Sequence, residues 1–195
     1  DETKSNFKIW IQGDNNDSNY FEDLDKCLDD LSADKPEVDY KITNDDDALY
    51  IYTSGTTGNP KAATISHKRL RLMMMGFKGA IQPNKNDRVY NVLPLYHSAG
   101  GVIAVGLALT SGASLVLKRK FSVNEFWDDV YKYKVTIFQY IGELCRYLLN
   151  APFHKHEKVH NLRMVSGNGL RPDIWNDFKE RFNIKNILEF YGATE

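Results

Sequence analysis

The later part of the chain alternates short apolar segments with amphipathic segments of helical length. Strands are expected at 89–93, 114–117, 135–140, 162–165 and 187–190, and helices between them at about 101–109, 123–133, 143–150 and 172–182. Repeated strand–helix–strand units place the strands parallel and side by side, with helices packed on the sheet. We therefore predict an α/β fold built on a largely parallel, doubly wound sheet with flanking helices.

The first part of the chain has a different character. Residues 7–12 alternate like a strand, and apolar residues then recur at helical spacing over 20–31, before Pro36. The acidic outer face of this predicted helix is more typical of a solvated surface than of a metal site. The polar segment 43–47 is either a domain boundary or a long surface loop. We assign 1–47 to a lead-in strand and helix of the same large domain, and 48–195 to a nucleotide- and acyl-binding core.

A predicted buried strand at 48–52 runs into a loop rich in hydroxyl groups and glycine. Small residues with closely spaced N–H groups can surround a phosphate, and a lysine adds a positive charge. A Walker A loop needs Gly, four residues and then Gly-Lys-Ser/Thr, whereas here Gly58 is followed by Asn59 and Pro60. A flexible surface turn is the alternative for such a composition. The predicted phosphate loop consists of Thr53, Ser54, Gly55, Thr56, Thr57, Gly58 and Lys61.

Three further loops follow predicted strands. The carboxyl ends of parallel strands meet at one edge of the sheet, where ligands bind in open α/β folds. One crevice can therefore collect the phosphate loop and these loops. Their candidate residues are His97 after 89–93, then Gly167, Asn168 and Gly169 after 162–165, and finally Tyr191, Gly192, Thr194 and Glu195 after 187–190.

The residues of two of these loops could instead have a purely structural role. His97 precedes a helix start, where its imidazole would lie near anionic groups, or would simply cap the helix or fill the core. Gly167 and Gly169 begin a GxGxxG pattern, but Pro172 replaces the third glycine, so a dinucleotide fingerprint is not met. A tight turn is the alternative for these glycines.

The order of the motifs resembles the adenylate-forming superfamily, and in particular its fatty acid transport protein branch, the very-long-chain acyl-CoA synthetases. The segments that carry this resemblance are 53–61, 93–100, 139–149, 167–171 and 191–195. The resemblance implies that the chain is an internal part of the large N-terminal domain of such an enzyme. It also implies that a hinge and a C-terminal domain with a catalytic lysine lie outside this chain, and that the chain alone is inactive.

The resemblance assigns roles to individual residues. Tyr191 would offer its ring to adenine, Thr194 its hydroxyl to the α-phosphate, and Glu195 would hold Mg²⁺ together with Thr53. The loop at 167–169 would border the adenine, and His97 would lie beside the acyl-adenylate. His97, Lys61 and Glu195 are thus the expected catalytic residues. Two departures stand out: Gly101 occupies the place of an aromatic gate to the acyl tunnel in some relatives, and Ala62 replaces a glycine that many superfamily members have.

The implied function is ATP-dependent activation of long- or very-long-chain fatty acids to acyl-CoA through an acyl-adenylate, coupled to fatty acid uptake. CoA is the co-substrate and Mg²⁺ the cofactor. Two alternatives remain: another acid–CoA ligase of the superfamily that uses an aromatic or short-chain acid, or a non-catalytic fragment that binds nucleotide or fatty acid.

Composition restricts the partners. The net charge of −1 and a pI near 6.6 provide no positive field for nucleic acid. Cys27 and Cys145 have neither metal-ligand nor CxxC spacing, which suits a reducing compartment. The uncharged segment 89–117 is interrupted by Pro94 and by glycines, so a membrane span is not expected there. We expect membrane contact through parts of the parent protein outside this chain, at the cytosolic face of an intracellular or plasma membrane. The sequence does not indicate an oligomeric state.

Overall fold

The computed structural model describes residues 8–13, 21–53 and 59–192. The chain forms two compact units, residues 1–41 and 42–195. In the first unit, β1 (Trp10–Ile11) pairs in parallel with β2 (Glu22–Asp23), and α1 (Leu24–Asp29) follows. The Asp23 carboxylate caps α1 by accepting a hydrogen bond from the Lys26 N–H at 3.1 Å.

The helix predicted over 20–31 was too long. Glu22 and Asp23 belong to β2, and α1 ends at Asp29 without burying any residue. Leu28 and Leu31, which were expected on its apolar face, are 51% and 67% exposed. A short helix gains most of its stability from packing, and here there is little apolar surface for it to pack on.

In the second unit, β3 (Asp47–Thr53) and β4 (Lys61–Ser66) form an antiparallel pair. The strand predicted at 48–52 is confirmed as β3, but the expectation that it is buried was wrong. Tyr50 and Tyr52 are 61% and 72% exposed, and Ile51 is the buried residue of β3. Among the described strands β3 pairs with β4 alone, and each of its residues except Ile51 is at least partly exposed.

The helix α2 (His67–Ile81) begins directly after β4. The Ser66 hydroxyl caps it by accepting a hydrogen bond from the Arg69 N–H at 3.3 Å. Met73 and Met74 pack against the buried Ile51 and Ile65. The methionines therefore fill a core rather than forming a lipid-binding face, although the neighbouring Met75 is 49% exposed.

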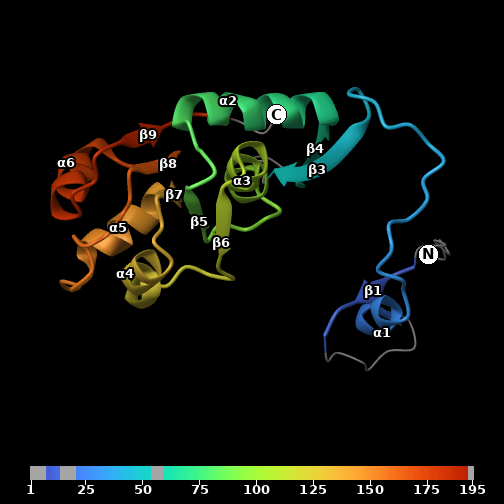
Figure 1. The fold of residues 1–195 in the computed structure, drawn as a ribbon, viewed down its shortest axis with the longest axis horizontal. Helices are drawn as coiled ribbons and strands as arrows, with labels where there is room; N and C mark the ends of the chain where they lie inside the picture. The colour runs from blue at the N-terminus through green and yellow to red at the C-terminus, as the bar shows by residue number, and fades with distance from the viewer. Residues whose placement is uncertain (1–7, 14–20, 54–58, 193–195) are drawn as a thin grey trace. The chain divides into compact units, whose positions relative to one another are not determined.

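The centre of this unit is a five-stranded sheet in the order β6-β5-β7-β8-β9, and every neighbouring pair is parallel. This confirms the predicted parallel sheet (Figure 1). The strands are β5 (Arg88–Asn91), β6 (Ser114–Leu117), β7 (Ile137–Ile141), β8 (Met164–Asn168) and β9 (Ile187–Glu189).

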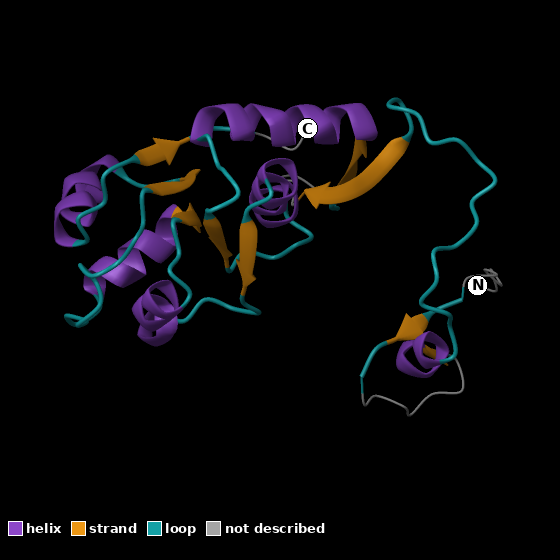
Figure 2. Cartoon of the chain, viewed as in Figure 1, coloured by secondary structure: helices purple, strands orange, loops and turns teal. Residues whose placement is uncertain are grey.

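Helices cover both faces of the sheet, which confirms the doubly wound arrangement (Figure 2). Alternate strand residues serve the two faces: Val89 and Ile137 join the cluster under α2 and α3, whereas Tyr90 and Phe138 join the cluster under α4, α5 and α6. Cys145 is fully buried in the second cluster. The helices are the π-helix η1 (Ser98–Ala104), α3 (Val105–Ser111), α4 (Val123–Lys132), α5 (Gly142–Asn150) and α6 (Pro172–Arg181).

Candidate functional site

The strand order places a topological switch point between β5 and β7. The chain passes from β5 to β6 on one side, then crosses to β7 on the other side of β5. Ligands of doubly wound sheets bind outside the carboxyl ends of the strands at such a point. A pocket of about 140 Å³ lies there, lined by Leu93, Pro94, Tyr96, His97 and Ile141.

His97 caps the helix that follows it, which is one of the roles considered for it. Its Nδ1 atom accepts a hydrogen bond from the Ala99 N–H at 3.2 Å, so the side chain caps η1. Because Nδ1 is an acceptor, the neutral imidazole carries its proton on Nε2. The ring is exposed and lines the pocket. A cap at Nδ1 therefore leaves an Nε2–H donor for an anionic ligand.

Gly101, four residues after His97, lies too close to the loop that follows β5 to carry a side chain. A Cβ atom at Gly101 would lie 1.9 Å from the carbonyl oxygen of Leu95. The first turn of η1 thus packs directly on the backbone of the loop that follows β5. No side chain fits at Gly101 in this conformation, and an aromatic gate at this position is excluded there.

The β3–β4 pair holds the two ends of the predicted phosphate loop together. Thr53 and Lys61 are Cα partners across the pair, and the Thr53 hydroxyl donates a hydrogen bond to the Lys61 carbonyl at 3.4 Å. Lys61 is exposed. Ile51 of β3 and Val102 of η1 share one buried cluster, which attaches this pair to the helix that His97 caps. The remaining residues of the predicted loop lie outside the described part of the chain: Ser54, Gly55, Thr56, Thr57 and Gly58.

The loop predicted at 167–169 lies partly within a strand, because β8 continues to Asn168. A Cβ atom at Gly167 would lie 2.3 Å from the Tyr140 carbonyl oxygen and 2.6 Å from its ring. Gly167 is therefore required by packing against Tyr140, whatever ligand the site takes. Gly169 has a φ of +81° and forms the turn that follows β8.

Buried polar atoms without partners mark the carboxyl half of the sheet. Within the described part of the chain, the side-chain oxygens of Ser166 and Asn168 and both amide atoms of Gln139 have no hydrogen-bond partner. Gln139 pairs in register with Asn91 on one side and Ser166 on the other, so these polar residues form a row across three strands. Unpartnered buried polar atoms are costly unless something binds them. Asn168 was predicted from the sequence, whereas Gln139 and Ser166 were not. The signal that could have found these two is a polar residue inside an otherwise apolar strand.

Glu189 connects the end of β9 to the turn after β8. Its carboxylate accepts hydrogen bonds from the Tyr140 hydroxyl and from the Leu170 N–H, the latter at 3.1 Å. Burial, and then the hydrogen bond to Glu189, raise the pKa of Tyr140 well above its usual value. These bonds position the segment that leads to Tyr191, whose side chain is 98% exposed. Gly192 is exposed as well, and Thr194 and Glu195 lie outside the described residues.

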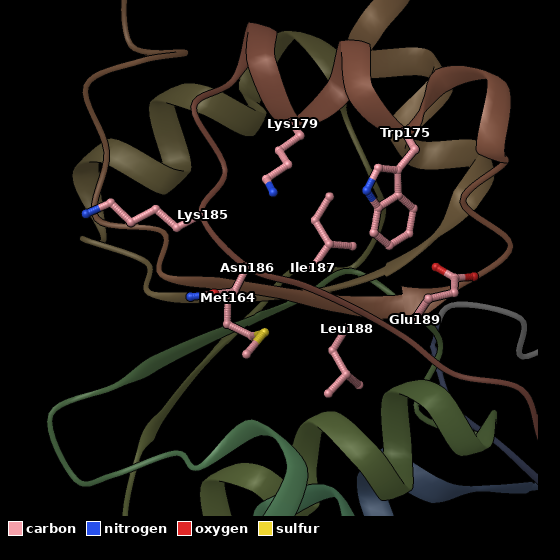
Figure 3. A pocket seen from close by; sticks show the side chains of 8 residues that line it. All are labelled: Met164, Trp175, Lys179, Lys185, Asn186, Ile187, Leu188 and Glu189. Atoms are coloured by element: carbon pink, nitrogen blue, oxygen red, sulfur yellow. The ribbon is translucent and has the colours of Figure 1, made fainter.

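A second pocket, of about 470 Å³, lies along β9 (Figure 3). Trp175 and Lys179 of α6 lie with Ile187 on one side of the strand, whereas Met164 and Leu188 point to the other side. The pocket contains none of the residues that the motifs predicted. The described β9 pairs with β8 alone, so this pocket lies beside a sheet edge.

Together these features define a class of protein: a doubly wound α/β domain with a ligand pocket at the switch point, lined by a histidine that caps the following helix. Comparison with known proteins then identifies the family. A family model for AMP-binding enzymes matches residues 3–195, and the chain belongs to that family.

Individual similar proteins point to one branch of this family. The chain is 53% identical to human long-chain fatty acid transport protein 1 over 151 residues, which cover 77% of this chain and 23% of that protein. It is 41% identical to a medium/long-chain-fatty-acid–CoA ligase of Mycobacterium tuberculosis over 175 residues, covering 89% of this chain and 29% of that protein. The predicted resemblance to the fatty acid transport protein branch is confirmed. The chain spans about a quarter of the length of these relatives.

A solved structure confirms the fold. The crystal structure of ATP-bound MatB from Rhodopseudomonas palustris matches with a TM-score of 0.77 and 25% identity, covering 88% of this chain and 34% of that one. The sheet and its helices are thus those of an adenylate-forming enzyme, as the motif order predicted.

Proposed function

We propose that the full-length protein activates long- or very-long-chain fatty acids to acyl-CoA with ATP, as a step coupled to fatty acid uptake. The observation that carries this proposal is the pocket at the switch point, where His97 presents an Nε2–H beside the apolar Leu93 and Ile141. Such a pocket suits a group that is anionic at one end and apolar at the other. The names of the relatives agree with this substrate class.

The reaction has two steps. The fatty acid carboxylate attacks the α-phosphorus of ATP, forming an acyl–phosphate bond as the bond to pyrophosphate breaks. The thiolate of CoA then attacks the acyl carbon and releases AMP. No covalent nucleophile of the protein is needed, so its task is to bind, orient and neutralise charge.

Different residues of the chain would bind the phosphates, donate to the reacting group and hold the metal ion. Lys61 and the loop residues Ser54, Gly55, Thr56, Thr57 and Gly58 would bind the phosphates of ATP, and His97 would donate to the reacting phosphate or carboxylate. Thr53 and Glu195 would hold Mg²⁺, which neutralises phosphate charge.

The nucleoside end would lie at β8 and β9. Tyr191 would stack on adenine, with Gly192 allowing the approach and Thr194 donating to the α-phosphate. The unpartnered Asn168 oxygen would accept a hydrogen bond from the exocyclic amino group of a base, and Gly169 leaves the backbone beside it free of a side chain. Here Gly167 serves the ligand only indirectly, through its packing on Tyr140.

Further parts of the proposal concern the whole protein. We assign 1–47 to the same large domain as the core at 48–195, and place catalysis at the cytosolic face of a membrane. No helix among the described residues is long and apolar enough to cross a bilayer. We propose that membrane contact comes from parts of the protein outside this chain.

The test is ATP–pyrophosphate exchange by the full-length protein with acids of increasing chain length and with aromatic acids. Exchange should be stimulated most by long-chain acids. Glu195→Gln keeps the size of the side chain but removes its charge, and should reduce exchange about a hundredfold or more. A preference for short or aromatic acids would favour another acid–CoA ligase, and exchange with none of the acids would favour a binding protein. Near-normal exchange by Glu195→Gln at low Mg²⁺ would contradict the metal assignment.

A further inference from the structure

A cluster of metal-ligating side chains lies outside the motifs described above. Asp128 of α4 meets His154 and His156 of the segment between α5 and β8, and the three candidate ligand atoms lie within 4.8 Å of one another. The segment precedes β8, so it lies at the amino edge of the sheet, whereas the pocket of His97 follows the carboxyl ends of β5 and β7. The cluster is thus separate from the candidate nucleotide site.

The spacing suits a small divalent ion. Asp128 Oδ1 lies 3.6 Å from His154 Nε2 and 3.0 Å from His156 Nδ1. Ligands bound tetrahedrally to Zn²⁺ at about 2.0–2.1 Å lie about 3.3–3.4 Å apart, a separation that these two distances bracket. The gap to His154 exceeds hydrogen-bond length, so that contact is not an ordinary hydrogen bond.

The surrounding contacts hold both histidines in place. The segment makes a turn closed by the Glu157 N–H donating to the His154 carbonyl at 3.0 Å. The buried Glu157 carboxylate accepts from the His154 N–H at 3.1 Å and pairs with Arg181 at 2.9 Å. The His156 ring stacks on Tyr131 at 4.0 Å. The first two contacts fix the backbone at His154, and the stacking on Tyr131 fixes the ring plane of His156.

We propose that Asp128, His154 and His156 bind a Zn²⁺-class transition-metal ion that ties the α5–β8 segment to α4. Two imidazoles and one carboxylate favour Zn²⁺ and its neighbours over Mg²⁺, which prefers oxygen ligands. The Asp128 side chain is 57% exposed, so a fourth position is open to water. On binding, the His154 proton moves to Nδ1, and the contact from the His156 N–H to that atom, 3.2 Å in this structure, is given up. The His156 proton, which in this structure lies between Nδ1 and Asp128 at 3.0 Å, moves to Nε2 and frees Nδ1 for the metal.

The experiment measures Zn²⁺ binding to the metal-free chain by titration calorimetry, with Co²⁺ absorption reporting the ligand set. We expect one site that Mg²⁺ does not compete for. His156→Gln and Asp128→Asn should each weaken binding by about tenfold or more. Saturating Zn²⁺ should raise the melting temperature of the unmodified chain by roughly 5 °C, and less in either variant.

Two control variants test the location. His67→Gln and Asp173→Asn remove one histidine and one exposed acid elsewhere, and both should bind Zn²⁺ like the unmodified chain. Circular dichroism checks that every variant is folded. No saturable Zn²⁺ binding by the unmodified chain, or equal affinity in the cluster variants and the controls, would overturn the proposal. Because the cluster is at the other edge of the sheet, its variants should leave ATP affinity unchanged, which separates this test from that of the proposed function.

Discussion

Lys61 stands at the mouth of the predicted phosphate loop, where β4 begins opposite Thr53. A flexible, exposed lysine attracts phosphate in the bound ground state as well as in the transition state. In the full-length protein, Lys61→Ala should therefore raise KM for ATP more than it lowers kcat. Steady-state kinetics of acyl-CoA formation at varied ATP measures both constants.

The matched control is Lys68→Ala, which removes an exposed lysine from the first turn of α2 and should leave both constants unchanged. A collapse of kcat at unchanged KM would require Lys61 to act in the transition state alone.

Gly167 allows its packing role to be separated from a role in ligand approach. An alanine there would place Cβ against the backbone and ring of Tyr140. Gly167→Ala should lower the free energy of unfolding by about 1–3 kcal/mol, measured by urea denaturation of the chain. Gly79→Ala is the control: a Cβ at Gly79 meets nothing within 4 Å in α2, and alanine there should stabilise by up to about 1 kcal/mol. If Gly167→Ala kept full stability but bound ATP more weakly, Gly167 would be required for the approach of the ligand rather than for packing.

Among the elements, the π-helix η1 is capped by His97, a side chain that is also a candidate for catalysis. His97 caps this π-helix through Nδ1 and offers Nε2 to a ligand. Asparagine can replace the cap but not the imidazole donor, whereas alanine replaces neither. His97→Ala should cost about 0.5–2 kcal/mol of stability, and His97→Asn much less.

Exchange activity should separate the two functions of His97. Both variants of the full-length protein should lose about a hundredfold in ATP–pyrophosphate exchange, the usual effect of removing one preorganised donor. If His97→Asn retained full exchange, the imidazole would be a cap and nothing more.

For the whole molecule, the parallel sheet was predictable because its strands and helices alternate with clear periods. Segment 114–117 matches β6, and the helices α4, α5 and α6 differ from prediction by a residue or so at their ends. The exposure of β3 was not predictable, since Tyr50 and Tyr52 are as typical of buried strands as of a two-stranded pair. Helix α1 failed for a related reason: apolar spacing does not reveal whether a core lies opposite.

The candidate site residues that belong to short sequence motifs were predictable. Those that come together from distant segments were not. The sequence pointed to His97 and Lys61, and the structure adds that His97 uses Nδ1 as a cap. Gln139 and Ser166 acquire meaning only through their register across β7 and β8. Asp128 and His156 are far apart in the chain, so their contact depends on tertiary folding.

A charged cluster at the amino edge of the sheet should control stability at low pH. Asp87 is 3% exposed, and both its oxygens accept from Arg163, at 2.8 and 2.7 Å. The Thr136 hydroxyl and the Asn84 N–H also donate to it, at 2.7 and 2.8 Å. The cluster thus ties together the segments that lead into β5, β7 and β8.

The pKa of Asp87 gives the sign of the effect. Burial alone would raise this pKa, but the hydrogen bonds from Arg163, Asn84 and Thr136 outweigh burial and hold it below its usual value. The unfolded chain therefore takes up this proton at a higher pH than the folded chain does. The stability that Asp87 contributes is complete above the unfolded pKa of about 3.9 and is lost as pH falls through the lower folded value.

Asp87→Asn should accordingly lower the free energy of unfolding near pH 7 by about 3 kcal/mol, because it removes the buried negative charge that pairs with the Arg163 guanidinium. Its unfolding free energy should also fall less steeply than that of the unmodified chain as pH is lowered from about 5 to 3. Urea denaturation across this range measures both quantities. The control Asp173→Asn removes an ion pair with Arg171 whose side chains are 59% and 70% exposed, and should change stability by no more than about 0.5 kcal/mol. If Asp87→Asn kept the pH dependence of the unmodified chain, acid unfolding would be governed by other carboxylates, such as Glu157 with its partner Arg181.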